Sequence, residues 1–225
     1  LVNELLHIDE SRNYCTHDYI DLFMQVLVQL IAGYSTDSSA NWLRHDPVFQ
    51  QGLNKTTLGS QSMVSRFIHQ LSEENIVQLQ SIAKALTTIY IGQQNTQHMI
   101  IDVDSTHSDT FGKQEQTDFN THYGTTGYHP LVAFDGLTGL FLGAELRPGN
   151  VYTSNNAEVF LADSISQHKQ HSCDMFLTVR GDSGFAKPEI YELCEQEKVK
   201  YIIRLKVNAR LKNMVQQKAF NGPDT

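Results

Sequence analysis

Two aspartates in one short segment occupy positions where carboxylates could bind metal ions. Residues 100–106 read Ile-Ile-Asp-Val-Asp-Ser-Thr, and the isoleucines and valine favour a strand. Asp102 and Asp104 are two residues apart, so on a strand they point to the same face. A carboxylate on the buried face of a central strand is unfavourable unless it is paired. Hard divalent cations pair well with carboxylates, which makes this segment a candidate metal site.

A third aspartate stands in a similar setting. The mainly apolar residues 175–180 are followed by Gly-Asp-Ser-Gly, which places Asp182 where a strand ends and a turn begins. Two aspartates from separate strands of one sheet can hold a pair of metal ions about 4 Å apart. The residues alone also allow a turn aspartate at Asp104 and an Asx-turn before Gly184 at Asp182.

Composition limits the class of protein. The chain has 225 residues, 40% of them hydrophobic, which is enough for one large domain or two modest ones. Its net charge of -8 argues against a protein that coats nucleic acid, although an acidic metal centre and a local basic groove can coexist. The three cysteines are far apart and fit free thiols in a reducing, cytoplasmic setting. The most apolar stretch, residues 20–32, carries polar residues at intervals of four, which indicates a helix with one wet face and no membrane span.

The elements fall into two groups. Residues 1–97 are predicted to be all-helical, with helices at 18–34, 38–43, 61–71 and 72–90. The Asp46-Pro47 pair is expected to end the second helix. Residues 98–225 change to strands at 99–104, 127–134, 140–146, 175–180 and 200–205, with helices at 155–167 and 188–197. Three mainly antiparallel strands, then helix, strand, helix and strand, is the order of a ribonuclease H-like α/β sheet flanked by helices, by analogy at the level of the fold.

Several segments together carry a family resemblance. The segments read Gln29-Leu30-Ile31-Ala32-Gly33-Tyr34, Leu43-Arg44-His45-Asp46-Pro47, Asp102-Val103-Asp104-Ser105-Thr106, Tyr128-His129-Pro130-Leu131, Leu146-Arg147-Pro148-Gly149-Asn150, Arg180-Gly181-Asp182-Ser183-Gly184-Phe185 and Tyr201-Ile202-Ile203-Arg204-Leu205. In this order they resemble the DDE transposases of bacterial insertion sequences, in the group catalogued as thirteen-eighty. The resemblance extends over nearly the whole chain.

The resemblance implies a site and a reaction. Asp104 and Asp182 are similar to the first and second catalytic, metal-binding aspartates, while Asp102 and Thr106 are expected to support them. Such enzymes use Mg²⁺, which Mn²⁺ can replace, to hydrolyse the phosphodiester at transposon ends and to join the freed 3′-hydroxyl to target DNA. The partners implied are transposon-end DNA, target DNA and a second copy in a homodimeric synaptic complex, in the bacterial cytoplasm at the nucleoid.

One part of the family pattern is not matched. The family's third acid is a glutamate after the fifth strand, whereas residues 206–225 contain Asp224 as their one acid. We therefore expect a chain that is C-terminally incomplete, truncated before the third acid, and weakly active or inactive.

Arginines are the candidate DNA contacts. Those near the acids stand beside strand ends, where a phosphate contact and a structural pair with Asp or Glu are both open. The segment 61–71 could be the second helix of a helix-turn-helix or a plain packed helix. The candidates are Arg44, Arg66, Arg147, Arg180 and Arg204.

Two other functions remain open. One is a non-catalytic DNA-binding remnant that competes with intact transposase for transposon ends, and it would bind without magnesium. The other is a metal-dependent nuclease of the same fold, which would cut DNA without producing strand-transfer products.

Overall fold

The computed structural model describes residues 1–10, 12–94, 97–171 and 175–220. Contacts between Cα atoms divide the chain into two compact units, Leu1–Ala83 and Lys84–Thr225. We call them the helical unit and the sheet unit, and each is described by itself. Within the described residues, no helix is both long and apolar enough to cross a membrane.

The helical unit is built from short helices around a small core. Tyr19, Leu22, Val64 and Phe67 are buried together, so α5 packs against α2 through its apolar stripe. The helices are α1 (Val2–Leu5), α2 (Tyr19–Ile31), the 3₁₀ turn η1 (Asp37–Ser39), α3 (Ala40–Leu43), α4 (Pro47–Gly52), α5 (Gln61–Gln70) and the first part of α6 (Glu73–Gln94).

Aspartates begin two of these helices. Asp18 caps α2 by accepting a hydrogen bond from the backbone N–H of Asp21 at 2.7 Å, where the start of this helix was predicted. Asp46 accepts from the N–H groups of Val48 and Phe49, and Pro47 is the first residue of α4. The Asp46-Pro47 pair therefore also starts a helix that we did not predict, because proline is well tolerated in a first helical turn.

The helix α6 extends across the division between the units. Ile91, near its end, is buried in the core of the sheet unit, and Thr87 donates a hydrogen bond to the carbonyl of Phe141 on β6. The division at Ala83 therefore lies near the middle of α6. It comes earlier in the chain than the boundary that we expected at residue 97.

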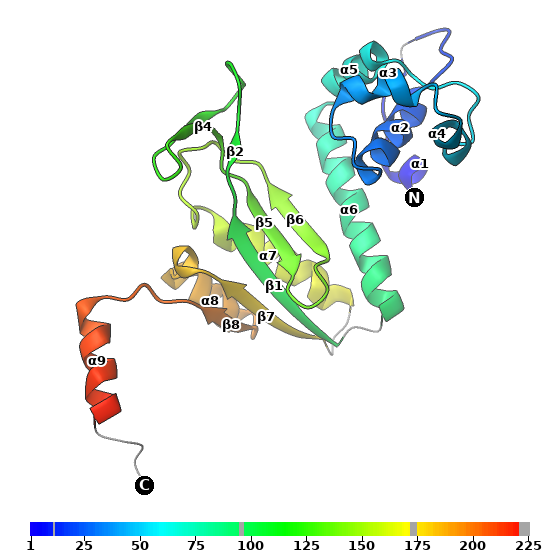
Figure 1. Cartoon of the computed structure of the whole chain (residues 1–225). Helices are drawn as coiled ribbons and strands as arrows, with labels where there is room; N and C mark the ends of the chain where they lie inside the picture. Colours follow the sequence, from blue (N-terminus) through cyan, green and yellow to red (C-terminus); the bar gives the residue numbers. More distant parts are fainter. Residues whose placement is uncertain (11, 95–96, 172–174, 221–225) are drawn as a thin grey trace. The chain divides into compact units, whose positions relative to one another are not determined.

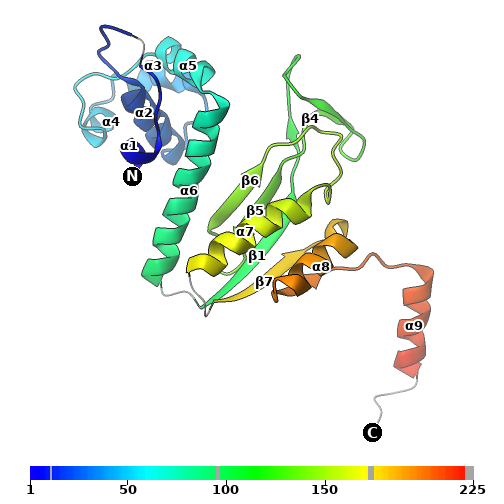
Figure 2. The same ribbon diagram turned by 180° about the vertical axis from the view of Figure 1, so that it is seen from behind.

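The sheet unit contains a five-stranded sheet in the order β6-β5-β1-β7-β8. The first three strands pair antiparallel, whereas β1, β7 and β8 are parallel. Figure 2 shows α7 and α8 on the same side of this sheet. This topology is ribonuclease H-like, as predicted. The elements are β1 (His98–Ser105), β5 (Leu131–Asp135), β6 (Phe141–Glu145), α7 (Ala157–His171), β7 (Phe176–Gly181), α8 (Pro188–Gln196) and β8 (Lys200–Ile203).

The two faces of the five-stranded sheet differ in burial. Along β1, Met99, Ile101 and Val103 are buried in the core, while Asp104 on the alternate face is exposed. Asp102 and Asp104 do share a face, but we expected a buried one and the structure places them on the more open one. That face is seen in Figure 1, where no helix lies in front of β1. A charged aspartate on this face can be hydrated, so its carboxylate does not need a positively charged partner or a metal ion in order to be stable.

A second, three-stranded sheet has the order β2-β4-β3. We predicted a single strand at 127–134, but the chain divides at His129-Pro130 into β4 and β5, which belong to different sheets. Pro130 has no backbone N–H to offer to a sheet, so the ladder is interrupted at this point. The strands are β2 (Ser108–Asp109), β3 (Asp118–Asn120) and β4 (Thr125–Tyr128). Neither β2, β3 nor the C-terminal helix α9 (Ala209–Phe220) was predicted.

Candidate active site

The fold brings Asp104 and Asp182 to neighbouring positions. Val103 of β1 pairs with Gly181 of β7 in parallel register, and each aspartate is the next residue along its strand. The carboxyl ends of parallel strands meet at one edge of a sheet, which is where ligands bind in open α/β sheets. Both aspartates line the same cleft.

Each carboxylate is oriented by its own backbone. Asp104 Oδ1 accepts a hydrogen bond from the N–H of Ser105 at 2.8 Å, and Asp182 Oδ1 accepts one from the N–H of Gly184 at 2.8 Å. The Asx-turn considered at Asp182 is therefore present and does not compete with a role in the cleft. Each carboxylate keeps a second oxygen with which it can bind a ligand.

The cleft has a volume of about 450 Å³ and walls from separate parts of the sheet unit. One wall is the loop between β6 and α7, where Thr153 hydrogen-bonds to Ser105 with 2.9 Å between the hydroxyl oxygens. Another wall is the segment 119–123, which contributes Phe119 and Tyr123. Lys206, after β8, brings a positive charge to the cleft. The walls thus combine two acids, aromatic rings and a cation.

Asp102 does not extend into this cleft. Its two carboxylate oxygens accept hydrogen bonds from Arg180, the residue directly opposite on β7. The pair links β1 to β7 one pleat before the catalytic candidates, which suits the supporting role predicted for Asp102. Arg180 is thereby engaged with an acid, one of the two possibilities left open by its sequence. Thr106, the other predicted support, is positioned through its backbone N–H, which donates to Pro130 at 3.0 Å.

Arg147, which we predicted to contact DNA, is a buried structural residue. It is 4% exposed, and its guanidinium donates to the backbone carbonyls of His129, Thr153 and Asn155, each at 3.1 Å. A guanidinium enclosed by carbonyls cannot reach a phosphate, so the structure contradicts this assignment. Burial lowers the pKa of Arg147, although an arginine stays protonated in a protein.

The remaining arginines are at surfaces. Arg204 is exposed after β8, and its backbone N–H donates to Gly181. Arg66 on α5 is exposed and donates from Nε to the carbonyl of Ser62 at 3.0 Å, while Arg44 is half-buried. These positions leave DNA contact open for all three.

A comparison with family models decides the membership of the chain. The model of the family described as transposase DDE domain group 1 matches residues 1–222. The chain belongs to this family of transposases. No curated protein matches it significantly.

The solved structures that are similar to this transposase-family chain are distant. The Mos1 transposase paired-end complex with left transposon end has 10% identity and a TM-score of 0.33, over 97% of this chain and 76% of that one. The piggyBac transposase synaptic complex with hairpin DNA has 14% identity and a TM-score of 0.44, over 98% and 50%. The HTLV-2 integrase catalytic core domain in complex with magnesium has 14% identity and a TM-score of 0.30, over 54% and 68%. Similarities of this size assign neither an activity nor a partner.

The donor set at the cleft suits the hard divalent cation implied by the family. Asp104 and Asp182 offer carboxylate oxygens, the ligands that Mg²⁺ prefers. Among the described residues that line the cleft, they are the two carboxylates, and no group of three or more potential metal ligands occurs anywhere in the described chain. The third acid of the family has no counterpart in this part of the chain.

Several cleft residues were missed by sequence reasoning. Tyr123 lies between His107 and His129, with ring centroids 4.6 and 6.1 Å away, so both histidines pack with an aromatic ring. Lys206 and Tyr152 were not singled out either. The sequence signal for Lys206 was its place directly after the fifth strand, at the same sheet edge as both aspartates.

Proposed function

We propose that this chain carries the catalytic centre of an insertion-sequence transposase, which hydrolyses a phosphodiester at the transposon end and joins the freed 3′-hydroxyl to target DNA. The supporting observation is the register of β1 and β7. Because Val103 faces Gly181 across the ladder, Asp104 and Asp182 follow at one edge and share one cleft.

Asp104 and Asp182 are the groups that would hold the divalent ions, Mg²⁺ or Mn²⁺ in its place. Ions in such sites supply activation of the attacking oxygen and stabilisation of the leaving oxygen. The protein's own contribution is orientation: backbone N–H groups fix one oxygen of each carboxylate. Lys206 would attract the negative phosphate to the cleft, since an ammonium is a compact phosphate-binding charge.

The test is cleavage and joining of labelled transposon-end DNA by the full chain with Mg²⁺ or Mn²⁺. Asp104→Asn and Asp182→Asn should each lower the rate by at least about a hundredfold, because each removes a charge that would stabilise the displacement. Both variants should keep their affinity for DNA. The matched control is Asp163→Asn, which removes an exposed carboxylate paired with Lys84 outside the cleft.

The outcomes separate three functions. Loss of cleavage and joining in both variants supports a transposase centre. Cleavage without joined product identifies a metal-dependent nuclease. DNA binding that needs no magnesium, without cleavage by the wild-type chain, identifies a binding remnant that competes for transposon ends.

The family's third carboxylate affects the expected rate of phosphodiester hydrolysis. Two acids neutralise less of the charge of two divalent ions than three acids would, and magnesium yields its waters reluctantly, so a site built from Asp104 and Asp182 is weakly occupied. We therefore propose that hydrolysis by residues 1–225 is slow and needs millimolar metal. Full activity of these residues at low metal concentration would contradict this.

The family resemblance extends the proposal to partners. We propose transposon-end and target DNA as ligands, a homodimer in the synaptic complex, DNA contact by the helical unit through Arg44 and Arg66, and a bacterial cytoplasmic setting at the nucleoid. The geometry of the cleft supports a nucleic-acid substrate in general and carries none of these finer assignments by itself.

A further inference from the structure

A second pocket adjoins the cleft. It has a volume of about 530 Å³ and lies between the loop before α7 and the start of α8. Asn150, Val151 and Tyr152 line both this pocket and the cleft with the aspartates, so the two share a wall. A polymer bound at the acids can therefore continue into the second pocket.

The size of the pocket selects what can enter. Its volume is within the range of about 300–1,000 Å³ that encloses a small organic ligand. A base pair within a duplex cannot fold into such a pocket, whereas one unpaired nucleotide fits.

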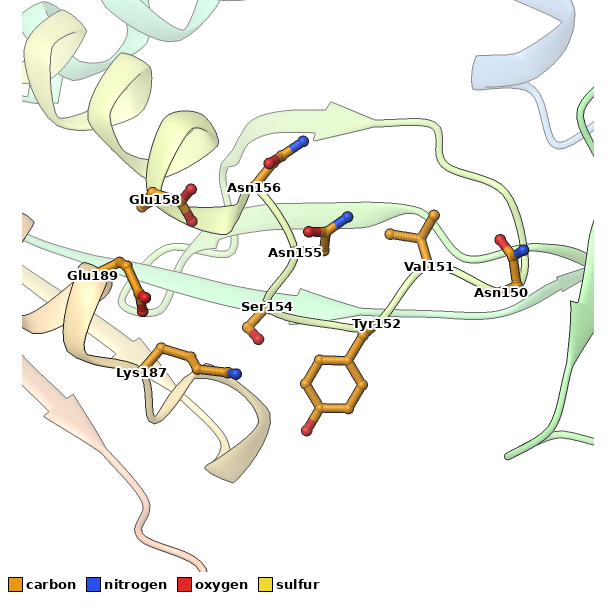
Figure 3. Close-up of a pocket in the computed structure, with 9 residues that line it drawn as sticks. All are labelled: Asn150, Val151, Tyr152, Ser154, Asn155, Asn156, Glu158, Lys187 and Glu189. Carbon is orange, nitrogen blue, oxygen red and sulfur yellow. The ribbon is translucent and has the colours of Figure 1, made fainter.

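The pocket offers a stacking surface. Tyr152 is 62% exposed, and Lys187 Nζ lies 5.9 Å from the centroid of its ring. Figure 3 shows Tyr152 and Lys187 extending toward the same opening from two different elements, with Ser154 between them. An exposed aromatic ring beside a cation is the usual arrangement for stacking an unpaired base and attracting its phosphate.

The charges of the pocket orient such a nucleotide. Glu158 and Glu189, on the first turns of α7 and α8, line the pocket away from the shared wall. Like charges repel, so a phosphate is disfavoured beside these carboxylates and is expected near Lys187. Carboxylates instead accept hydrogen bonds from the amino groups of bases. The base is therefore expected on the side of the pocket with the carboxylates, and the phosphate on the side with Lys187.

Hydrogen bonds hold the shared wall and the loop residues that follow it. Arg147 donates to the carbonyls of Thr153 and Asn155, and a ring nitrogen of His129 lies 2.7 Å from the carbonyl of Val151. Asn150 donates to Asp118 at 2.6 Å. Preorganisation of this kind lowers the entropy cost of ordering a binding loop.

We propose that this pocket binds one unpaired nucleotide of the DNA strand that leaves the cleft, with its base stacked on Tyr152 and its phosphate at Lys187. The proposal rests on the proposed function, because it takes DNA to be the polymer in the cleft. It adds a single-stranded subsite to that function.

The test measures binding without cleavage. The full chain carrying Asp104→Asn is titrated in the absence of divalent metal with a blunt duplex and with the same duplex bearing a short single-stranded overhang that contains 2-aminopurine. The overhang should increase affinity, and the 2-aminopurine fluorescence should be quenched on binding. Adding Tyr152→Ala should weaken overhang binding by about tenfold and abolish the quenching, whereas blunt-end binding should weaken much less. Lys187→Gln should weaken overhang binding and make it less dependent on salt.

Two controls keep the result interpretable. Tyr152→Phe retains the ring and should bind the overhang nearly as the parent does, while Tyr14→Ala removes an exposed tyrosine of the helical unit and should change nothing. Because Tyr152 is exposed, its replacement should leave thermal unfolding unchanged. Equal binding of blunt and overhang DNA by the parent, or equal loss of both in Tyr152→Ala, overturns the subsite and leaves the proposed function standing. Failure of the wild-type chain to bind either DNA contradicts both.

Discussion

Arg147 shows how one buried side chain determines the shape of the cleft wall. It satisfies the carbonyls of His129, Thr153 and Asn155, which belong to two separate loops. Arg147→Met keeps an unbranched apolar stem but removes the guanidinium, which leaves these buried carbonyls without their donor. We expect a loss of about 3 kcal/mol in the free energy of unfolding, since hydrogen bonds to a charged group contribute about 1.5–3 kcal/mol each and are not additive. Urea denaturation measures this, and Arg204→Met, at an exposed position, should cost under about 0.5 kcal/mol.

The cysteines differ in burial and therefore in expected reactivity. Cys194 is buried beneath the sheet, and burial raises the pKa of its thiol to about 11, whereas Cys15 is exposed. The thiolate is the nucleophile, so at pH 8 iodoacetamide should alkylate Cys15 quickly and Cys194 hardly at all until the chain is unfolded. Peptide mapping by mass spectrometry separates the sites, including Cys173, which lies outside the described residues. Rapid native alkylation of Cys194 would contradict its burial.

At the scale of elements, Gly149 is where three backbone segments meet. A Cβ at this position would lie 2.2 Å from the carbonyl oxygen of Asp118 on β3 and 2.7 Å from that of Gly127 on β4. Backbone oxygens cannot move aside cheaply, so Gly149→Ala should separate the three-stranded sheet from the cleft wall. We expect destabilisation of about 1–3 kcal/mol by overpacking. Gly52→Ala is the control, because a Cβ there meets nothing within 4 Å; equal unfolding of the two variants would show that Gly149 is not constrained.

At the scale of the whole molecule, charge is unevenly distributed. The helical unit has four Lys and Arg against nine Asp and Glu, a net charge of -5, while residues 204–218 carry five basic residues and no acid. DNA binding should therefore be local and weaken steeply with salt. Replacing both Arg210 and Lys212 by glutamine should make the slope of log K for DNA binding against log[salt] shallower by up to about 1.8. This corresponds to about 0.9 for each phosphate that the chain no longer neutralises.

Two arginines of the helical unit provide the comparison for the salt dependence of DNA binding. Replacing Arg44 and Arg66 together by glutamine tests whether that unit also contacts phosphate. A slope changed by this pair and not by Arg210 and Lys212 would place the main electrostatic contact in the helical unit and not in residues 204–218. A response to salt that is flat in the wild-type chain would exclude phosphate contact as the source of affinity.

Local signals in the sequence determined much of the fold. Strand β1 follows from its β-branched residues, α2 from the helical periodicity of its apolar residues, and α8 from Pro188 at its first position. Each depends on neighbours within a few residues, which are visible in any sequence. The order of these elements also indicated the ribonuclease H-like sheet, and with it the meeting of Asp104 and Asp182 at one edge.

What only the tertiary structure decided depends on residues far apart in the chain. The strands β2 and β3 are two and three residues long and exist through pairing with β4, so propensity could not indicate them. Arginine is usually a surface residue, so nothing in the sequence indicated that Arg147 is buried. Only the backbone carbonyls gathered around its guanidinium make this burial favourable. Asp104 shares a cleft with Lys206, which follows far later in the chain, through two steps of parallel pairing. Such proximity is a property of the assembled sheet, because no local pattern records which distant residue will complete a site.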